Sequence, residues 1–218
     1  MDIKTSINYF LNGYRKNKGR KPDERYASFD FCYNYFYSFY KNNKIKELAS
    51  QENIQTSCLQ LGFYLASWGM LRGSSFLLEK SISNFKNLII AISNMSSVLW
   101  EIDVDKYTGN NIELLLECKQ KIADALGKEN KPSDTLITKI MLGVFANVPA
   151  YDQYVRKSFK LHSFNKKSLL KIKKVYDENK QILDSFQIPT YDFCTSVETG
   201  VFYTKAKIID MYGFVNRQ

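Results

Sequence analysis

Apolar side chains recur three and four residues apart along most of this chain, and this spacing limits the possible fold more than any other feature. Such a period places an apolar face along a helix, whereas a strand alternates every second residue. The four prolines, at positions 22, 132, 149 and 189, divide the chain into segments long enough for helices. The pattern therefore predicts an all-α fold in which residues 1–218 form one compact domain of about eight helices.

The expected helices follow this period between turn and capping signals. They cover residues 3–15, 22–42, 53–72, 76–99, 110–126, 133–146, 150–160, 166–185 and 203–214. Gly127 follows one of these helices as a C-cap, and Ser133 or Asp134 is expected to cap the start of the next. We expect residues 187–202 to form an irregular connection with a short extended piece, after a basic N-terminal segment at residues 1–21.

The segment after Pro22 carries an aromatic stripe with one carboxylate inside it. Its aromatic residues are Tyr26, Phe29, Tyr33, Phe36, Tyr37 and Tyr40. Asp30 lies within this stripe, and a carboxylate on a buried face needs a partner. Arg72 and the tyrosine hydroxyls are candidate partners. Asp30 is therefore interpreted either as half of a buried structural pair or as an acid in a functional cleft.

Small residues recur in LQLGFYLASWGMLRGSSFLL, residues 59–78, at Gly62, Ala66, Gly69 and Gly73. Glycine inside a helix costs about 1 kcal/mol relative to alanine, so its repeated use indicates close packing of another backbone. This face predicts a tight helix–helix contact or a homo-oligomer. Alternatively it lines a cleft that Trp68 and Arg72, four residues apart, also face, with Arg72 as an anion contact.

A net charge of +9 and a pI near 9.2 suit a negatively charged partner, nucleic acid above all. An AT-rich genome would produce the same excess of lysine without such a partner. The predicted nucleic-acid face combines the basic N-terminal segment with the helix at 166–185, for which a solvated lysine face is the alternative. Its residues are Arg15, Lys16, Lys18, Arg20, Lys21, Lys166, Lys167, Lys171, Lys173 and Lys174.

Other classes of protein are excluded by features that the sequence lacks. No apolar run reaches the ~20 residues that span a bilayer, and the charged first residues contain no apolar signal core, so we expect a cytoplasmic protein without a membrane partner. The four cysteines are far apart and His162 is the only histidine, so no metal site is expected. A Cys–His nucleophile using His162 stays an alternative. The sequence contains no phosphate-binding loop, dinucleotide fingerprint or serine elbow, and no cofactor is expected.

The stretch KIMLGVFANVPAYDQYVRKSF, residues 139–159, begins as a helix, breaks at Asn147–Pro149 and restarts at Tyr151 and Asp152. With its immediate flanks, it resembles the segment of the helix-hairpin-helix DNA glycosylases in which a turn delivers the catalytic Asp to a helix N-terminus. The resemblance implies an all-α fold, DNA as the substrate and Asp152 as the catalytic acid or base. Val155 stands where the family has valine, and Lys157 stands where it has Arg.

The same region departs from that family in three respects. Residues 127–138, GKENKPSDTLIT, lack the family's Leu-Pro-Gly-Val-Gly hairpin, and Tyr154 replaces its His. Lys139 precedes Asp152 by fewer positions than the family's catalytic lysine precedes its Asp. In the alternative reading, Asp152 is only an N-cap that accepts backbone N–H groups of the next helix. Residues LASWGMLRGSSFLL and DTLITKIMLGVFANVPAYD are also similar to a bacterial group of proteins of uncharacterised activity.

Three functions are consistent with these features. The first is a helical protein that binds nucleic acid or a phosphate-bearing ligand through a basic face. The second is an enzyme related to the glycosylases, with Asp152 as its acid or base in a cleft lined by Trp68, Arg72 and Tyr151. The third is a non-catalytic interaction module that assembles through the small-residue face. The second requires that Asp152 and Arg72 share one cleft.

Overall fold

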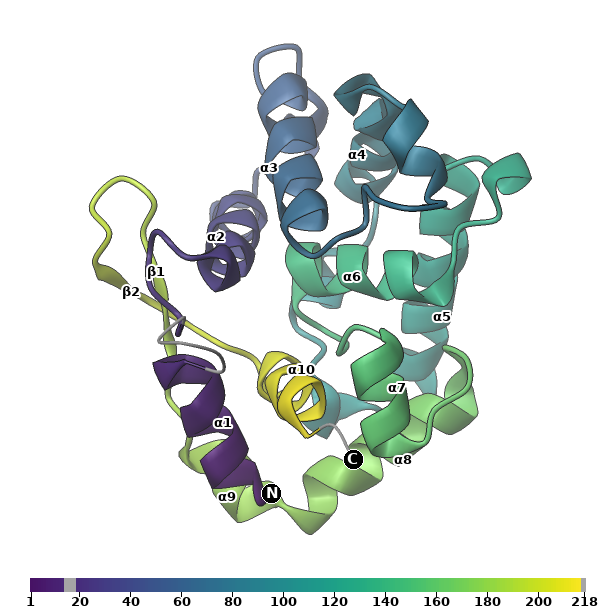
Figure 1. The fold of residues 1–218 in the computed structure, drawn as a ribbon. Coiled ribbons are helices and arrows are strands. Elements are labelled where there is room, and N and C mark those ends of the chain that lie inside the picture. The colour runs from purple at the N-terminus through teal and green to yellow at the C-terminus, as the bar shows by residue number, and fades with distance from the viewer. Residues whose placement is uncertain (14–18, 217–218) are drawn as a thin grey trace.

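Ten α-helices and a two-stranded antiparallel sheet are seen in the computed structural model, which describes residues 1–13 and 19–216. The helices are α1 (Ile3–Asn12), α2 (Ser28–Lys41), α3 (Ile54–Ser67), α4 (Lys86–Ser93), α5 (Gly109–Ala125), α6 (Asp134–Phe145), α7 (Gln153–Phe159), α8 (Lys166–Glu178), α9 (Lys180–Ser185) and α10 (Lys205–Val215) (Figure 1). The strands are β1 (Pro189–Tyr191) and β2 (Glu198–Phe202). The predicted all-α fold class is confirmed, and the short extended piece expected within 187–202 is this hairpin.

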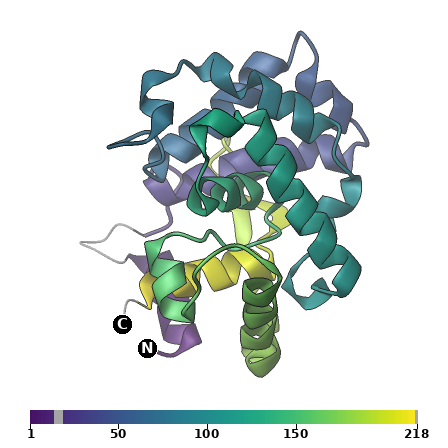
Figure 2. The ribbon, with the colours of Figure 1, turned by 90° about the vertical axis from the view of Figure 1, so that its right-hand side faces the viewer.

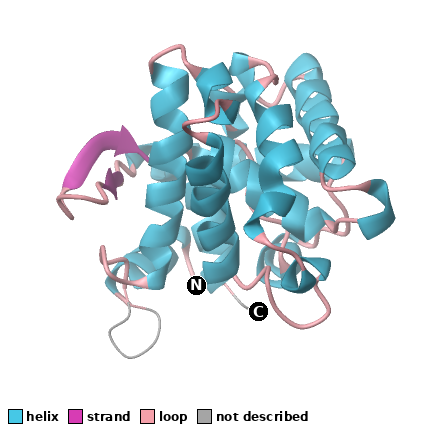
Figure 3. Cartoon of the chain, turned by 90° about the horizontal axis from the view of Figure 1, so that it is seen from above, coloured by secondary structure: helices cyan, strands magenta, loops and turns pink. Residues whose placement is uncertain are grey.

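The helices pack around one continuous set of buried apolar side chains that extends along the chain from Ile3 to Val215. In Figure 1, α6 lies in the centre, α3 and α4 lie above it, and α1 and α10 run side by side below. The view turned by 90° shows α8 at the lower end of the molecule (Figure 2). Seen from above, the hairpin lies at one edge of the helical body (Figure 3). No helix in the described part of the chain is both long enough and apolar enough to cross a bilayer.

The prediction of one long helix over residues 76–99 is wrong. The chain instead forms short 3₁₀ turns at Phe76–Glu79, Ile82–Phe85 and Ser97–Trp100, with only α4 as an α-helix. The Ser75 and Ser96 side chains each accept a backbone N–H at the start of such a turn. Serine that bonds to nearby backbone competes with helical hydrogen bonds, and the serines of this segment interrupt its apolar period.

Two other helix boundaries differ from the predicted ones. The helix expected over 166–185 divides at Asn179, whose backbone leaves the helical region and whose side chain donates to the Val175 carbonyl. The helix expected to reach Arg72 ends at Ser67, because Gly69 adopts φ +76°, a left-handed conformation that glycine accepts readily. Arg72 therefore lies in the loop after α3.

The early end of α3 also changes the predicted small-residue face. Gly62 and Ala66 are on the helix, whereas Gly69 and Gly73 lie beyond it with positive φ values. Gly62 makes its close contact inside the chain, because a Cβ added there would collide with the Ile82 side chain. The four small residues therefore do not form one helix face, and the predicted homo-oligomer loses that basis.

Candidate binding cleft

A cleft of about 890 Å³ opens where five elements meet. The 3₁₀ turn Arg25–Ala27 before α2 forms one wall together with the end of α3 and the loop that follows it. The other wall is made by α6 and by the first residues of α7, and Phe214 of α10 also lines the cleft. Trp68, Arg72 and Asp152, predicted from sequence to belong to one site, all line this cleft.

The turn between α6 and α7 places Asp152 in the cleft. Ala146 ends α6 in a left-handed conformation, and side chains from two helices then hold the backbone that follows. The Thr138 hydroxyl of α6 accepts the N–H of Tyr151 at 2.7 Å, and the Asp210 carboxylate of α10 accepts that of Ala150 at 3.0 Å. The break in the sequence at Asn147–Pro149 is thus a tightly bonded turn rather than a loose loop.

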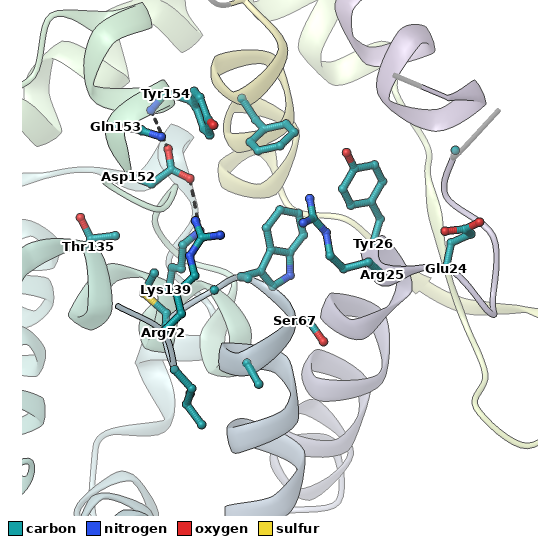
Figure 4. Close-up of a pocket in the computed structure, with 17 residues that line it drawn as sticks. Glu24, Arg25, Tyr26, Ser67, Arg72, Thr135, Lys139, Asp152, Gln153 and Tyr154 are labelled. Carbon is teal, nitrogen blue, oxygen red and sulfur yellow. Dashed lines mark hydrogen bonds and ion pairs between the residues drawn. The ribbon is translucent and has the colours of Figure 1, made fainter. Parts of the chain in front are cut away.

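Asp152 is both a helix cap and a cleft residue. Its Oδ1 accepts the backbone N–H groups of Tyr154 at 2.9 Å and Val155 at 3.1 Å, which caps α7 as predicted. Its Oδ2 lies 3.3 Å from the Nζ of Lys139 on α6 (Figure 4). The Lys139 side chain is 5% exposed and that of Asp152 is 14% exposed, so the pair is shielded from most solvent but remains reachable from the cleft.

Aromatic rings line the cleft beside this pair, and the Lys139 Nζ lies 5.1 Å from the Trp68 ring centroid. Phe10, Tyr26 and Trp68 stack in sequence, with ring centroids 4.5 Å and 5.5 Å apart and interplanar angles of 19° and 16°. Phe214 meets the Tyr26 and Trp68 rings edge-on. Tyr26 and Trp68 are half-buried, so part of each ring is open to the cleft. This geometry fixes the rings before any ligand arrives.

Two arginines enter the cleft without an ion-pair partner among the residues that the structure describes. Arg72 lies over Gly69, where an added Cβ would come within 2.8 Å of its Nε. The Arg25 guanidinium carbon lies 5.3 Å from the Tyr26 ring centroid and 5.4 Å from that of Trp68. In Figure 4, Arg72 lies close to Lys139 and Asp152, whereas Arg25 extends from the side where Tyr26 and Glu24 lie.

A second lysine–aspartate pair lies behind the cleft, with Lys207 Nζ 3.3 Å from Asp210 Oδ2 on α10. Both side chains are buried, and the Lys207 ammonium lies 4.4 Å from the Phe29 ring centroid and 5.3 Å from that of Trp68. Burial lowers the pKa of Lys207 and raises the pKa of Asp210, because each charged form has lost its water. Since Asp210 also holds the backbone of Ala150, this pair supports the turn that carries Asp152.

Two of the predicted cleft residues lie elsewhere. Tyr151 is fully buried, with its hydroxyl donating to Ser168, because its ring points into the core while the next residue turns toward the cleft. Asp30 is also fully buried, and its partners are Arg20, the Tyr191 N–H and the Tyr203 hydroxyl. The prediction that a tyrosine hydroxyl bonds to Asp30 is confirmed, and the prediction of Arg72 as its partner is wrong. The contacts of Asp30 are those of a buried structural pair.

The predicted nucleic-acid face is only partly assembled. Arg20 is buried against Asp30 and is not a surface residue, whereas Lys21 is exposed. Lys173 is bound to Asp177 at 2.9 Å. Arg15, Lys16 and Lys18 lie outside the described residues. Four lysines of α8 surround Leu170 in a shallow depression of about 470 Å³: Lys166, Lys167, Lys171 and Lys174. Lys174 also lies 3.7 Å from the Glu178 carboxylate.

Sequence reasoning missed the roles of Arg25, Lys139, Lys207 and Asp210. The sequence does indicate three of them: Lys139, Lys207 and Asp210 each interrupt a mostly apolar run within a helix. A charge at such a position needs a partner in the folded chain. No group of three or more His, Cys, Asp or Glu side chains in the described residues is placed to hold a metal ion.

Comparisons with known proteins give no information on this cleft, so its interpretation depends on its geometry. No protein-family model, curated protein or solved structure matches the chain.

Proposed function

We propose that the cleft binds nucleic acid or another phosphate-bearing ligand. Two pairs of features support this: arginines that have no carboxylate partner in the described structure, and aromatic rings that are partly open to the cleft. Arginine matches phosphate oxygens with a planar set of donors, and aromatic faces accept any base. We therefore propose the cleft as the binding site, rather than the helical lysine face alone.

The single observation that carries the proposal is that two arginines in the cleft have no ion-pair partner among the described residues. Arg25, Arg72 and Lys139 line it, against two carboxylates, Glu24 and Asp152. Lys139 is occupied by Asp152, which leaves both arginines available. Elsewhere, Arg20 and Lys207 are buried only together with a carboxylate. Arginines that line a concave site and have no carboxylate partner are placed to bind an anion from solution.

The lysines around Leu170 on α8 supply a second surface for the same class of ligand. Contacts from lysine to a phosphate backbone add affinity without reading sequence. With a net charge of +9, the chain would attract nucleic acid before the cleft is engaged. The cleft and the α8 surface should therefore contribute separately to the affinity for nucleic acid, and substitutions in one or the other measure each contribution.

Fluorescence anisotropy with labelled single-stranded and duplex oligonucleotides tests the proposal. The affinity of the wild type should fall linearly with salt on a log–log plot. Arg72→Gln should weaken binding about tenfold and lower the slope by about one, because one charge-assisted phosphate contact is lost. Arg156→Gln removes the same charge from an exposed position outside the cleft and serves as the control. The proposal fails if no oligonucleotide binds at low salt, or if the two variants behave alike.

A second candidate function, cleavage of a base from DNA, is favoured by the placement of Asp152. The sequence-based requirement was that Asp152 and Arg72 share a cleft, and both line it. A carboxylate in a partly shielded site can act as an acid or base on a bound ligand, and Lys139 beside it is a further polar group within reach. The absence of Tyr151 from the cleft removes one of the residues expected for this activity.

Asp152→Asn tests this candidate, since the asparagine oxygen can still cap α7. Oligonucleotides with deaminated, oxidised or alkylated bases are incubated with the protein and then treated with alkali, which cleaves the strand wherever a base has been released. We expect strand cleavage with the wild type and at least a hundredfold slower release with the variant, within the range for loss of an acid or base. Asp105→Asn, an exposed residue, is the matched control. Equal rates in the two variants would remove Asp152 from the chemistry.

A further inference from the structure

We infer that the Arg25 guanidinium and the indole N–H of Trp68 form a phosphate subsite at the aromatic side of the cleft. The inference rests on the proposed function and deepens it, because it gives the phosphate one defined place among the cleft residues. It is carried by an unsatisfied donor and an unpaired cation that lie against the same ring.

The Trp68 indole N–H is a buried donor without an acceptor in the described structure. The chain's other tryptophan shows the usual arrangement, since the Trp100 indole donates to the Val144 carbonyl at 3.1 Å. A buried donor that lacks an acceptor destabilises a fold, so most such groups are bonded. Of the described side chains with a buried orphan atom, Trp68 is the one that lines the cleft. This nitrogen exposes less than 1 Å² to solvent, so we expect its acceptor to be a ligand oxygen that reaches the N–H when the neighbouring side chains move aside.

Arg25 supplies the charge for this acceptor. Its guanidinium carbon is 5.3 Å and 5.4 Å from two ring centroids that are themselves 5.5 Å apart. These nearly equal distances place the guanidinium beside the Tyr26–Trp68 stack, level with the gap between the rings. Because the Arg25 side chain is exposed and has no ion-pair partner in the described part, it can adjust as an oxygen reaches the indole N–H.

One competing charge is the carboxylate of Glu24, which also lines the cleft. Figure 4 shows the Arg25 head inside the cleft and Glu24 on the far side of Tyr26. No ion pair joins Glu24 to Arg25 within the described residues. Glu24 therefore lowers the local positive potential without occupying the guanidinium.

The subsite adjoins the Lys139–Asp152 pair, because the Lys139 Nζ lies 5.1 Å from the Trp68 ring centroid and the Arg25 guanidinium carbon lies 5.4 Å from it. A phosphate held by Arg25 and Trp68 leaves the rest of the ligand to extend toward Lys139, Asp152 and Arg72. The same oxyanion chemistry is offered by a phosphomonoester, as in a mononucleotide, and by a phosphodiester within a nucleic-acid strand. The two sources are distinguished by the probe.

NMR of the ¹⁵N-labelled full chain tests the subsite, because the chain contains only two tryptophans and hence two indole N–H signals. Trp68→Phe assigns them. The probes are inorganic phosphate, a nucleoside 5′-monophosphate and an oligonucleotide without a terminal phosphate. We expect the Trp68 signal to shift downfield and saturate while the Trp100 signal stays in place. A shift with the oligonucleotide shows that a phosphodiester occupies the subsite, and a shift with only the other two shows a phosphomonoester.

Substitutions that should weaken or strengthen phosphate binding allow the same titration to be compared quantitatively. Trp68→Phe keeps an aromatic ring but loses the donor, and should weaken phosphate binding about tenfold, as should Arg25→Gln. Glu24→Gln should strengthen it about two- to threefold, because it removes a partly exposed opposing charge. Arg156→Gln should leave it unchanged.

The subsite is refuted if the Trp68 signal stays fixed, or if sodium chloride of equal ionic strength reproduces its shift. It is also refuted if Trp68→Phe binds phosphate as the wild type does. An oligonucleotide that binds by anisotropy without moving the Trp68 signal would refute the subsite and leave the proposed function standing. If none of the probes binds by either method, both are refuted.

Discussion

Asp30→Ala is expected to destabilise the fold strongly, since the Asp30 carboxylate satisfies donors from three parts of the chain. Its Oδ2 accepts from Arg20 Nε at 3.0 Å, from Arg20 Nη2 at 2.9 Å and from the Tyr191 N–H at 2.9 Å. Its Oδ1 accepts from the Tyr203 hydroxyl. The variant leaves these donors without their shared acceptor, and the Arg20 side chain is only 4% exposed.

Breaking a buried pair by removing one partner costs about 3–5 kcal/mol, because an uncompensated charge remains. This is a large share of the ~5–15 kcal/mol by which a typical domain is stable. The Arg20 guanidinium also lies over the Tyr191 and Tyr203 rings, at 4.1 Å and 5.0 Å from their centroids, and these contacts survive the substitution. We therefore expect a value near the lower end of that range.

Equilibrium unfolding in urea, followed by circular dichroism, measures this cost. Asp105→Ala, at an exposed site, should change the free energy of unfolding by less than about 0.5 kcal/mol. The double variant Arg20→Met with Asp30→Leu removes both charges and should recover most of the loss, since an apolar pair of similar volume is often neutral. A cost below about 1 kcal/mol for Asp30→Ala would refute the reasoning. So would a double variant that is no more stable than the single one.

Three further predictions concern other sites. Lys207→Met should cost about 3–5 kcal/mol at pH 7, because it strands the Asp210 carboxylate. Burial raises the pKa of Asp210, so the loss should shrink as pH falls through that raised value and the carboxyl takes up a proton. A loss that stays constant in urea titrations as pH is lowered from 7, over the range in which the wild type stays folded, would contradict this. Gly143→Ala should cost about 1–3 kcal/mol, because the new Cβ collides with the Tyr64 ring, and an unchanged melting temperature would contradict it. Ser133→Ala should lower stability by about 1 kcal/mol through loss of the bond from the Leu136 N–H, so a melting temperature equal to that of the wild type would be evidence against this cap.

Helices with a regular apolar period and a clear cap were predictable from the sequence. The helix expected over 110–126 corresponds to α5 (Gly109–Ala125), and Ser133 caps α6 as expected. The segment 76–99 was not predictable in the same way, since an apolar period does not reveal that serines will bond to the backbone instead. The early end of α3 depends on the left-handed conformation of Gly69, which the sequence permits but does not require.

The candidate site was predictable where residues lie close in sequence. Trp68, Arg72 and Asp152 were identified from local spacing and a local turn, and they do share the cleft. Partners distant in sequence were not predictable. Asp30 is held by Tyr203, which is 173 positions away, so this contact forms only when the end of the chain packs against α2. Local spacing likewise gave no indication of the direction in which the Tyr151 ring turns.

The central claim is that the cleft, rather than the α8 lysine surface alone, holds the phosphate-bearing ligand. The most direct test compares, at one salt concentration, the oligonucleotide affinity of two variants in which cationic side chains are replaced by glutamine. One variant carries Arg25→Gln and Arg72→Gln, and the other replaces by glutamine the four lysines around Leu170. Loss of two charge-assisted contacts should weaken binding about a hundredfold in the arginine variant, against a smaller loss in the lysine variant. An arginine variant that binds as the wild type does, with the whole loss in the lysine variant, would contradict the account.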